Sequence, residues 1–289
     1  MPHKILEKKL NQLLAEDVGQ GDVTSAAVVP AGLKAEAVIM AKEVGIAAGI
    51  EETVILAKSL GLSVKTEVAD GKQIRNEQIL IKLSGDIRTI LSAERTMLNL
   101  LSRMSGIATA TSRLVEKLRK ANLTTKIAAT RKTALGLLYF DKKAVIVGGG
   151  DPHRLCLDDM VLVKDNHLAI AGGVEKAVKK VKQAASFSKK IEVEVTSIAD
   201  ALKATKAGAD IIMLDNFSPK QINEAIKALK KAGFFGKVLL EASGGITEQN
   251  LLAYAQTHVD VISMGALTHS VKALDVSLEI IRVEKRGES

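Results

Sequence analysis

Short apolar segments and helical stretches alternate along the second half of the chain. The apolar segments are 126–130, 160–164, 191–195, 210–214, 238–242 and 259–264. Segments with one apolar helical face separate most of them, at 174–185, 198–208, 219–233 and 247–257. This alternation is typical of parallel strands joined by right-handed crossovers. At least six such units in about 150 residues favour a (β/α) barrel over an open doubly wound sheet.

The first part of the chain has a different pattern. An apolar stripe that includes Leu6, Leu10 and Leu14 predicts an N-terminal helix. Strand-like segments follow at 34–43, 62–71 and 78–85, with a helix at 49–61 and one or two long helices over 91–120. We therefore predict an N-terminal α/β domain over 1–105 and a barrel over 106–270. A last helix at about 271–289 is expected to pack on the first domain.

Polar residues or glycines follow almost every predicted barrel strand. They include Lys132, Lys164, Glu194 and Asp215, and the glycine turns that contain Gly244 and Gly265. Parallel buried strands are apolar along their length, so these residues mark strand ends. In a (β/α) barrel, the carboxyl ends of the strands meet on the face that carries the active site. The pattern therefore predicts one site at that end of the barrel.

Four cations, Arg131, Lys132, Arg154 and Lys164, gather at this predicted site, with His153 beside them. Such a group would repel itself unless an anion of comparable charge binds there. Arginine supplies paired donors for a carboxylate or phosphate, and lysine supplies a mobile charge. Any one of these cations could instead form a surface salt bridge, but the set together favours a multiply anionic substrate.

The glycine turns and the acidic strand ends extend this prediction. Ser243, Gly244, Gly245 and Gly265 lie after the last strands, where such barrels bind phosphate; they could also be simple tight turns. Glu194 and Asp215 end adjacent strands and could share Mg²⁺, since oxygen ligands suit that ion. They could equally pair with nearby lysines. Taken together, the cations, glycine turns and acidic strand ends predict a site for a phosphorylated substrate, in which catalysis relies on charge stabilisation and positioning.

Composition limits the class of protein. The 289 residues carry a net charge of +8, but many lysines fall in 176–190 and 227–237, on predicted outer helix faces. With no Trp, two Tyr and five Phe, we expect no stacking platform for nucleic acid. A single cysteine, Cys156, excludes a disulfide framework, and we expect it to pack in the interior. The N-terminus lacks a signal peptide and no long apolar segment occurs, so we expect a cytoplasmic protein that binds no membrane.

Several motifs resemble those of quinolinate phosphoribosyltransferase, in the order of that family. They are EDVGQGDVTS (16–25), AERTMLNLLSRMSGIAT (93–109), ATRKT (129–133), GGGDPHR (148–154), VKDNH (163–167), EVEV (192–195), MLDNF (213–217), EASGGI (241–246) and ISMGALTHS (262–270). The resemblance covers nearly the whole chain. It implies an N-terminal α/β sandwich and a C-terminal (β/α) barrel with fewer than eight strands. It also implies transfer of phosphoribosyl from 5-phosphoribosyl-1-pyrophosphate (PRPP) to quinolinate, which releases pyrophosphate and CO₂ and makes nicotinate mononucleotide for NAD synthesis, with Mg²⁺.

The resemblance also implies roles for individual residues. Quinolinate would be bound by Arg95, Thr130, Arg131, His153, Arg154 and Lys164. PRPP phosphates would be bound by Lys132, Ser243, Gly244, Gly245, Gly265 and His269. Lys132, Lys164, Glu194 and Asp215 would be catalytic, the last two near Mg²⁺. Arg95 resembles an arginine that reaches the site of a neighbouring subunit, which implies a homodimer with shared sites, and a hexamer is an open alternative.

One segment departs from the family pattern. After TRKT, residues 134–138 read ALGLL, where the family usually has a proline and an arginine. This departure motivates a second interpretation, a related phosphoribosyltransferase that acts on nicotinate or a similar acid. A third interpretation, a binding protein without catalysis, rests only on the net charge.

Overall fold

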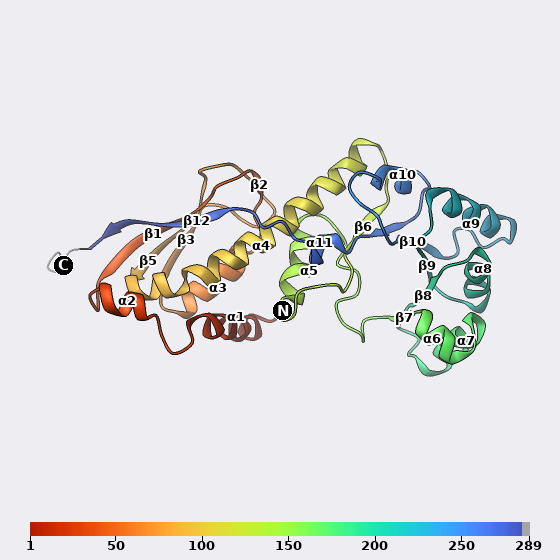
Figure 1. Cartoon of the computed structure of the whole chain (residues 1–289), viewed down its shortest axis with the longest axis horizontal. Coiled ribbons are helices and arrows are strands. Elements are labelled where there is room, and N and C mark those ends of the chain that lie inside the picture. The colour runs from red at the N-terminus through yellow and green to blue at the C-terminus, as the bar shows by residue number, and fades with distance from the viewer. Residues whose placement is uncertain (285–289) are drawn as a thin grey trace. The chain divides into compact units, whose positions relative to one another are not determined.

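The computed structural model describes residues 1–284, which form two compact units (Figure 1). The first unit combines Met1–Ser112, Tyr139–Gly149 and the residues from Val271 onward. The second combines Arg113–Leu138 and Gly150–Ser270. Each unit has its own sheet, so the chain is mixed α/β with the two kinds of sheet kept apart.

The first unit is built on a four-stranded antiparallel sheet in the order β12-β1-β5-β3. Its strands are β1 (Lys34–Ala41), β3 (Ser63–Thr66), β5 (Ile79–Asp86) and β12 (Val276–Val283). A separate two-stranded ribbon pairs β2 (Gly45–Ile46) with β4 (Gln73–Ile74). The helices are α1 (His3–Val18), α2 (Val23–Val28), α3 (Ile50–Ser59), the first part of α4 (Ile87–Lys120), and α5 (Leu138–Val147).

The helices of this unit follow from their sequence patterns. In α1 the leucine stripe is buried, with Leu6 and Leu10 almost fully enclosed, and α1 packs against α3. The predicted long helical region is one continuous helix, α4, because no proline or run of turn residues interrupts 87–120.

The predicted C-terminal helix is wrong for residues 276–283, which form strand β12. This segment pairs antiparallel with β1, and Leu278 lies opposite Ile39. Its sequence, VSLEIIRV, is rich in β-branched residues that suit a sheet edge, and its local pattern does not exclude a helix. The pairing partner more than 200 residues away therefore decides the outcome. Residues 285–289 of the predicted helix lie outside the described residues.

The second unit is built on a six-stranded parallel sheet in the order β6-β11-β10-β9-β8-β7. Its strands are β6 (Lys126–Ala128), β7 (Val161–Val163), β8 (Ile191–Val195), β9 (Ile211–Asp215), β10 (Leu239–Ser243) and β11 (Val261–Ser263). These are the six apolar segments predicted from the sequence, and the expectation of fewer than eight strands is confirmed. β6 and β7 stand at the two ends of the order, and Asp151 bridges to Ala128 beside β6.

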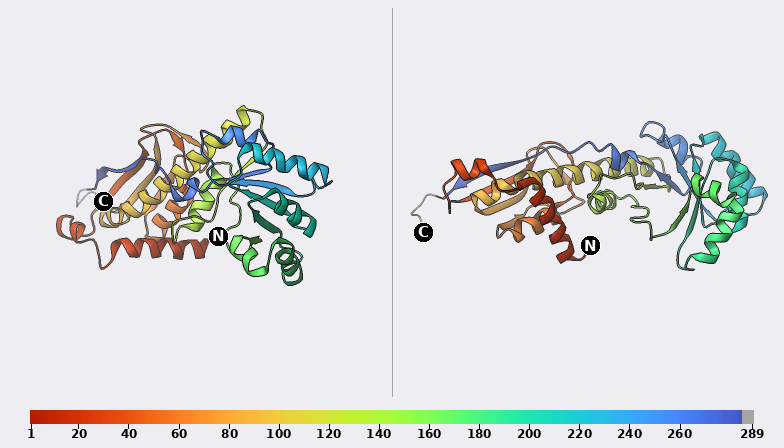
Figure 2. Two further views of the ribbon diagram at one scale, coloured as in Figure 1. Left: turned by 45° about the vertical axis from the view of Figure 1, so that its right-hand side comes forward. Right: turned by 60° about the horizontal axis from the view of Figure 1, so that its bottom comes forward.

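Helices on the outer side of this sheet join its strands (Figure 2). They are α6 (Asp165–Ala171), α7 (Val174–Ala184), α8 (Ile198–Ala207), α9 (Pro219–Lys231) and α10 (Leu251–Ala255). A short helix, α11 (Ala266–His269), follows the last strand of the sheet, β11. α10 is shorter than predicted, because residues 247–250 form a turn. α9 starts at a capping box, in which the Ser218 side chain accepts the amide N–H of Gln221.

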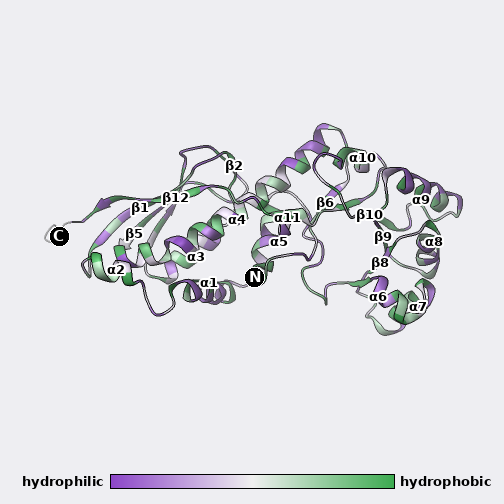
Figure 3. Cartoon of the chain, viewed as in Figure 1, coloured by the Kyte–Doolittle hydropathy of each residue, from purple (hydrophilic) through white to green (hydrophobic). Residues whose placement is uncertain are grey.

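Most of the excess positive charge lies on exposed helix faces, as predicted. α7 and α9 bury Val178 and Ile222 while their lysines stay exposed. Figure 3 shows hydrophilic and hydrophobic stretches alternating around these helices. Within residues 1–284, none of the helices combines the length and the apolar character needed to cross a membrane.

Candidate active site

A cavity of about 730 Å³ opens at the carboxyl ends of the six parallel strands. All the residues that line it belong to the second unit. Every predicted site residue except Arg95 lines this cavity: Thr130, Arg131, Lys132, His153, Arg154, Lys164, Glu194, Asp215, Ser243, Gly244, Gly245, Gly265 and His269. The prediction that strand ends bring these residue types together is therefore confirmed, although their individual roles remain predictions.

Three of the four predicted cations form no ion pair within the described part of the chain. Among residues 1–284, no carboxylate forms an ion pair with Arg131, Lys132 or Arg154. Burial lowers the pKa of Arg154, and the nearby charge of Arg131 lowers it further. Unpaired cations that face one another favour the binding of a multivalent anion, because the anion would relieve their repulsion.

Lys164 is the cation that already has a partner. Its Nζ lies 2.8 Å from Glu194 Oε2, and the two residues end the neighbouring strands β7 and β8. The alternative that Glu194 pairs with a local lysine is thus realised in this structure. The lysine side chain is about half exposed, so the pair can open when a substrate competes for either group.

Asp215 ends β9 beside this pair. Burial raises the pKa of Asp215, and the negative charge of Glu194 raises it further. The Asn216 amide donates a hydrogen bond to Asp215 Oδ2 at 2.8 Å. The negative charge of Glu194 beside Asp215 makes this part of the cavity a suitable environment for a cation.

The glycine loops bring backbone close to the cavity. At Gly244 the backbone φ is +94°, and a Cβ atom would meet Asn216 Oδ1 at 2.2 Å. At Gly265 a Cβ atom would lie 2.9 Å from the ring of His269. A side chain at either position would force its neighbour to move, and the backbone of both glycines lines the cavity. Thr268 Oγ1 donates to the Lys132 carbonyl at 2.8 Å and ties the second loop to the first strand.

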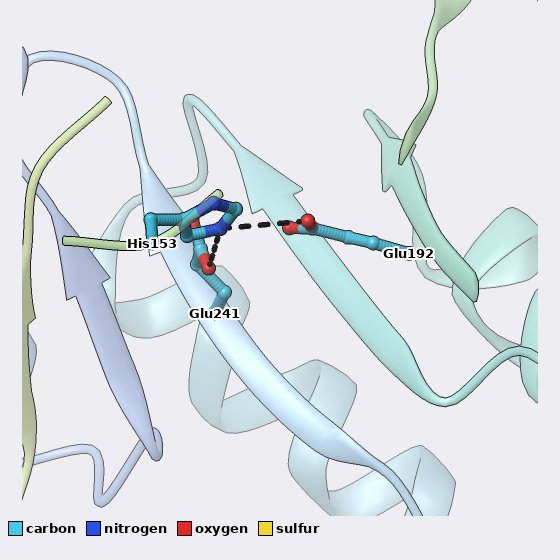
Figure 4. A group of neighbouring side chains, drawn as sticks. All are labelled: His153, Glu192 and Glu241. Carbon is cyan, nitrogen blue, oxygen red and sulfur yellow. Dashed lines mark hydrogen bonds and ion pairs between the residues drawn. The ribbon is translucent and has the colours of Figure 1, made fainter. Parts of the chain in front are cut away.

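His153 is fixed by its loop and by two glutamates that the sequence analysis did not select. Its φ is +53°, and its amide donates to Asp151 Oδ1 at 2.7 Å. Its Nε2 lies 3.1 Å from Glu241 Oε2 and 3.5 Å from Glu192 Oε2 (Figure 4). Burial alone would lower the pKa of His153, but the two carboxylates outweigh it and raise the pKa to about 10.

A sequence signal for these glutamates exists. Glu192 and Glu241 lie inside strands that are otherwise apolar, and both are buried, with at most 1% of their surface exposed. A charged residue in the interior of a buried parallel strand is costly unless it has a partner. The sequence analysis considered only polar residues at strand ends, so it passed over these two.

Arg95 is the one predicted site residue that does not line the cavity. It is exposed on α4, in the part of that helix that belongs to the first unit.

Two features in the loops of the second unit are exposed to solvent: Cys156 and Leu135. Cys156 was expected to pack in the interior, but it is exposed, since it lies in a turn closed by Asp159 Oδ2. The departing segment 134–138 exposes Leu135 completely. An exposed leucine in a loop beside the cavity contributes nothing to the packing of this chain.

Both parts of the chain match models of one protein family. Residues 22–105 match the quinolinate phosphoribosyl transferase N-terminal domain, and residues 107–279 match its C-terminal domain. The chain is 48% identical over 285 residues to a probable nicotinate-nucleotide pyrophosphorylase (carboxylating) of Methanocaldococcus jannaschii, which covers 97% of this chain and 98% of the relative. It is 40% identical over 259 residues to the human nicotinate-nucleotide pyrophosphorylase (carboxylating), which covers 90% of this chain and 86% of the relative.

The fold agrees with solved structures of such proteins. The nicotinate-nucleotide pyrophosphorylase of Francisella tularensis superposes with a TM-score of 0.88 at 37% identity, over 98% of both chains. The match therefore extends over both units and is not limited to the barrel.

Proposed function

Since the chain belongs to the quinolinate phosphoribosyltransferase family, we propose that its cavity joins quinolinate to the ribose of PRPP in de novo NAD synthesis. The products are nicotinate mononucleotide, pyrophosphate and CO₂. The observation that carries this proposal is one cavity that holds two acidic strand ends and three cations without an ion pair among the described residues. A dicarboxylate and a sugar phosphate are both multiply anionic, and together they match this arrangement.

Quinolinate recognition rests on the arginines. Arg131 and Arg154 can each donate two parallel hydrogen bonds to a carboxylate, and they lack competing carboxylates among the described residues. Two carboxylates on adjacent ring carbons would satisfy both arginines at once. Thr130, His153 and Lys164 line the same cavity and would complete the binding of the acid.

PRPP binding rests on the loops that follow β10 and β11. Gly244, Gly245 and Gly265 leave backbone amides accessible, and Lys132 and His269 lie at the same side of the cavity. Amides and a lysine together favour a phosphate group. Phosphate held here would place the ribose toward Glu194 and Asp215.

The transfer step needs charge stabilisation on both sides of the breaking bond. The C1–oxygen bond of PRPP breaks, and its electron pair leaves with the pyrophosphate. The quinolinate ring nitrogen donates the pair that forms the new bond to C1. Lys132 and Lys164 would stabilise the leaving group, and Glu194 and Asp215 would stabilise positive charge on the ribose.

Decarboxylation follows from the new bond. The ring nitrogen is positive once it is bonded to ribose, so it can accept the electrons released when the neighbouring carbon–carboxylate bond breaks. CO₂ departs, and the ring carbon takes up a proton. The chain's arginines hold the dicarboxylate in place during this step but exchange no electrons with it.

Glu194 and Asp215 also fit a divalent ion, because their neighbouring carboxylates offer oxygen ligands of the kind that Mg²⁺ prefers. When bound, Mg²⁺ would neutralise negative charge on the pyrophosphate. Lys164 Nζ donates a hydrogen bond to Glu194 in this structure. We propose that substrate binding with the ion releases this lysine toward the phosphates.

Assembly and location remain proposals. Arg95 is exposed on α4, which supports a homodimer in which it reaches the quinolinate of a second subunit. The hexamer and the cytoplasmic location rest on the sequence alone.

A single assay tests the proposed function. The protein is mixed with PRPP, Mg²⁺ and quinolinate labelled with carbon-13 at the carboxylate next to the ring nitrogen. We expect labelled CO₂ and unlabelled nicotinate mononucleotide in equal amounts. Turnover of nicotinate in place of quinolinate, without CO₂, would contradict the proposal.

A further inference from the structure

Three groups from three separate elements meet at the wall of the cavity, which His153 and Glu241 line (Figure 4). His153 comes from the loop before β7, Glu192 from β8 and Glu241 from β10. The imidazole Nε2 contacts Glu241 Oε2 at 3.1 Å and Glu192 Oε2 at 3.5 Å. The second oxygen of Glu241 and both oxygens of Glu192 have no hydrogen-bond partner among the described residues. Two buried acids thus depend on one histidine ring.

None of the other described groups around the His153 ring provides a further negative charge in contact with it. β9 lies between β8 and β10 and places Met213, which carries no charge, opposite Glu241. Asp151, in the histidine's own loop, accepts the backbone amide and not the ring. Arg154 follows in the chain and carries the remaining charge nearby. The two glutamates are therefore the groups that can compensate a positive charge on His153.

The histidine in turn touches the quinolinate-binding arginine. The backbone amide nitrogen of Arg154 lies 2.8 Å from His153 Nδ1. The Arg154 N–H donates to Nδ1 when Nδ1 carries no proton. When Nδ1 also carries a proton, this contact is lost, and the ring N–H needs another acceptor while Nε2 stays with Glu241. A carboxylate of quinolinate in the cavity is such an acceptor.

We propose that Glu241, supported by Glu192, is a positioning residue for quinolinate: it holds Nε2 of His153 and keeps the ring positively charged at the wall of the cavity that receives the dicarboxylate. This inference rests on the proposed function. Its geometric basis is the buried contact between strand and loop, and the raised pKa of His153 agrees with it. With Glu241 and Glu192 in place, His153 would keep its positive charge for quinolinate binding as the pH rises through neutrality.

The variant Glu241→Gln tests the proposal, because glutamine keeps the size and an acceptor oxygen but removes the charge. Histidine-labelled protein is titrated by NMR, and the five histidines are assigned with a His153→Gln variant. We expect the midpoint of His153 to fall by at least about one pH unit toward its ordinary value near 6.5. Glu224→Gln, an exposed substitution on α9, is the matched control and should leave the midpoint unchanged.

Kinetics supply the second measurement. In Glu241→Gln the KM for quinolinate should rise by up to about tenfold for each pH unit above the new midpoint, because binding then requires uptake of a proton. The KM for PRPP should stay constant. If Glu241→Gln fails to fold, as judged by circular dichroism, Glu192→Gln is measured in the same way, and the expected changes have the same sign.

Several outcomes would overturn the proposal. An unchanged His153 midpoint with an unchanged pH profile would do so. A fall in kcat together with equal rises in the KM for quinolinate and the KM for PRPP would also do so, because it indicates a structural role. Removal by a chelator of a divalent ion bound to these three groups would also overturn it. If the parent protein does not turn over quinolinate, the proposed function fails, whereas the NMR titration still decides the charge of His153.

Discussion

At the scale of single residues, the two arginines of the cavity carry the most direct prediction. Arg131→Ala or Arg154→Ala should weaken quinolinate binding by about 2–5 kcal/mol, because a charged hydrogen bond is lost in a desolvated site. Arg131→Lys should also weaken quinolinate binding, since a single ammonium group cannot donate two parallel hydrogen bonds to one carboxylate. Calorimetric titration with quinolinate measures this effect.

The matched control for the arginines is Arg119→Ala. Arg119 is exposed and pairs with Glu116 on the surface of α4, so its loss should leave quinolinate affinity unchanged. Full affinity in both cavity variants would remove the arginines from the binding site.

The acidic strand ends should affect turnover more than binding. Glu194→Gln and Asp215→Asn remove charge that would stabilise the ribose only in the transition state, so kcat should fall much more than quinolinate affinity. Steady-state kinetics with calorimetry separates the two effects. A variant with normal kcat would show that its carboxylate has a structural role.

Asp215 also predicts a pH dependence. Its pKa is raised, so it takes up a proton at a higher pH than an ordinary aspartate as the solution is acidified. If its ionised form is required, kcat should therefore fall on the acid side sooner than an ordinary aspartate would allow. In Asp215→Asn the residual kcat should lack this decline. A decline that persists in that variant would have to come from another group.

At the scale of elements, α4 and the segment before β12 are packed without spare volume. Gly106 lies inside α4, and a Cβ atom there would come within 2.2 Å of the Lys272 carbonyl oxygen. Alanine normally stabilises a helix relative to glycine by about 1 kcal/mol. Here we expect Gly106→Ala to lower the free energy of unfolding by about 1–3 kcal/mol, because backbone must move.

Urea unfolding of Gly106→Ala measures this effect. Asn99→Ala, an exposed substitution on the same helix, is the control and should change stability by less than about 0.5 kcal/mol. A stabilised Gly106→Ala variant would mean that the chain from Val271 does not cross α4 so closely.

The same scale shows which elements sequence patterns can predict. The six strands of the second unit were predictable, because buried parallel strands such as β9 are apolar along most of their length. β12 was not, because its identity depends on pairing with β1, far away in the chain. Site residues at strand ends were found by position, whereas Glu192 and Glu241 are interior residues whose importance depends on the approach of His153.

At the scale of the whole molecule, the proposed dimer predicts complementation. Inactive Arg95→Ala is mixed with inactive Arg154→Ala, and the subunits are allowed to exchange. Two-fold symmetry gives each mixed dimer one site with both lesions and one intact site, so it should show about half of the parent activity. Absence of recovery, despite exchange demonstrated by mass spectrometry, would mean that Arg95 serves its own subunit or no site.

The position of β12 has a consequence for biosynthesis. The first unit opens the chain, yet one edge of its sheet is supplied by residues 276–283. As the ribosome releases the polypeptide from its N-terminus, β1 must wait for its neighbour until almost the whole barrel has been translated. During that interval β1 presents unpaired amides and carbonyls, the kind of edge that recruits other nascent chains. Fast completion of the barrel during translation would therefore protect the protein from aggregation before its first domain is finished.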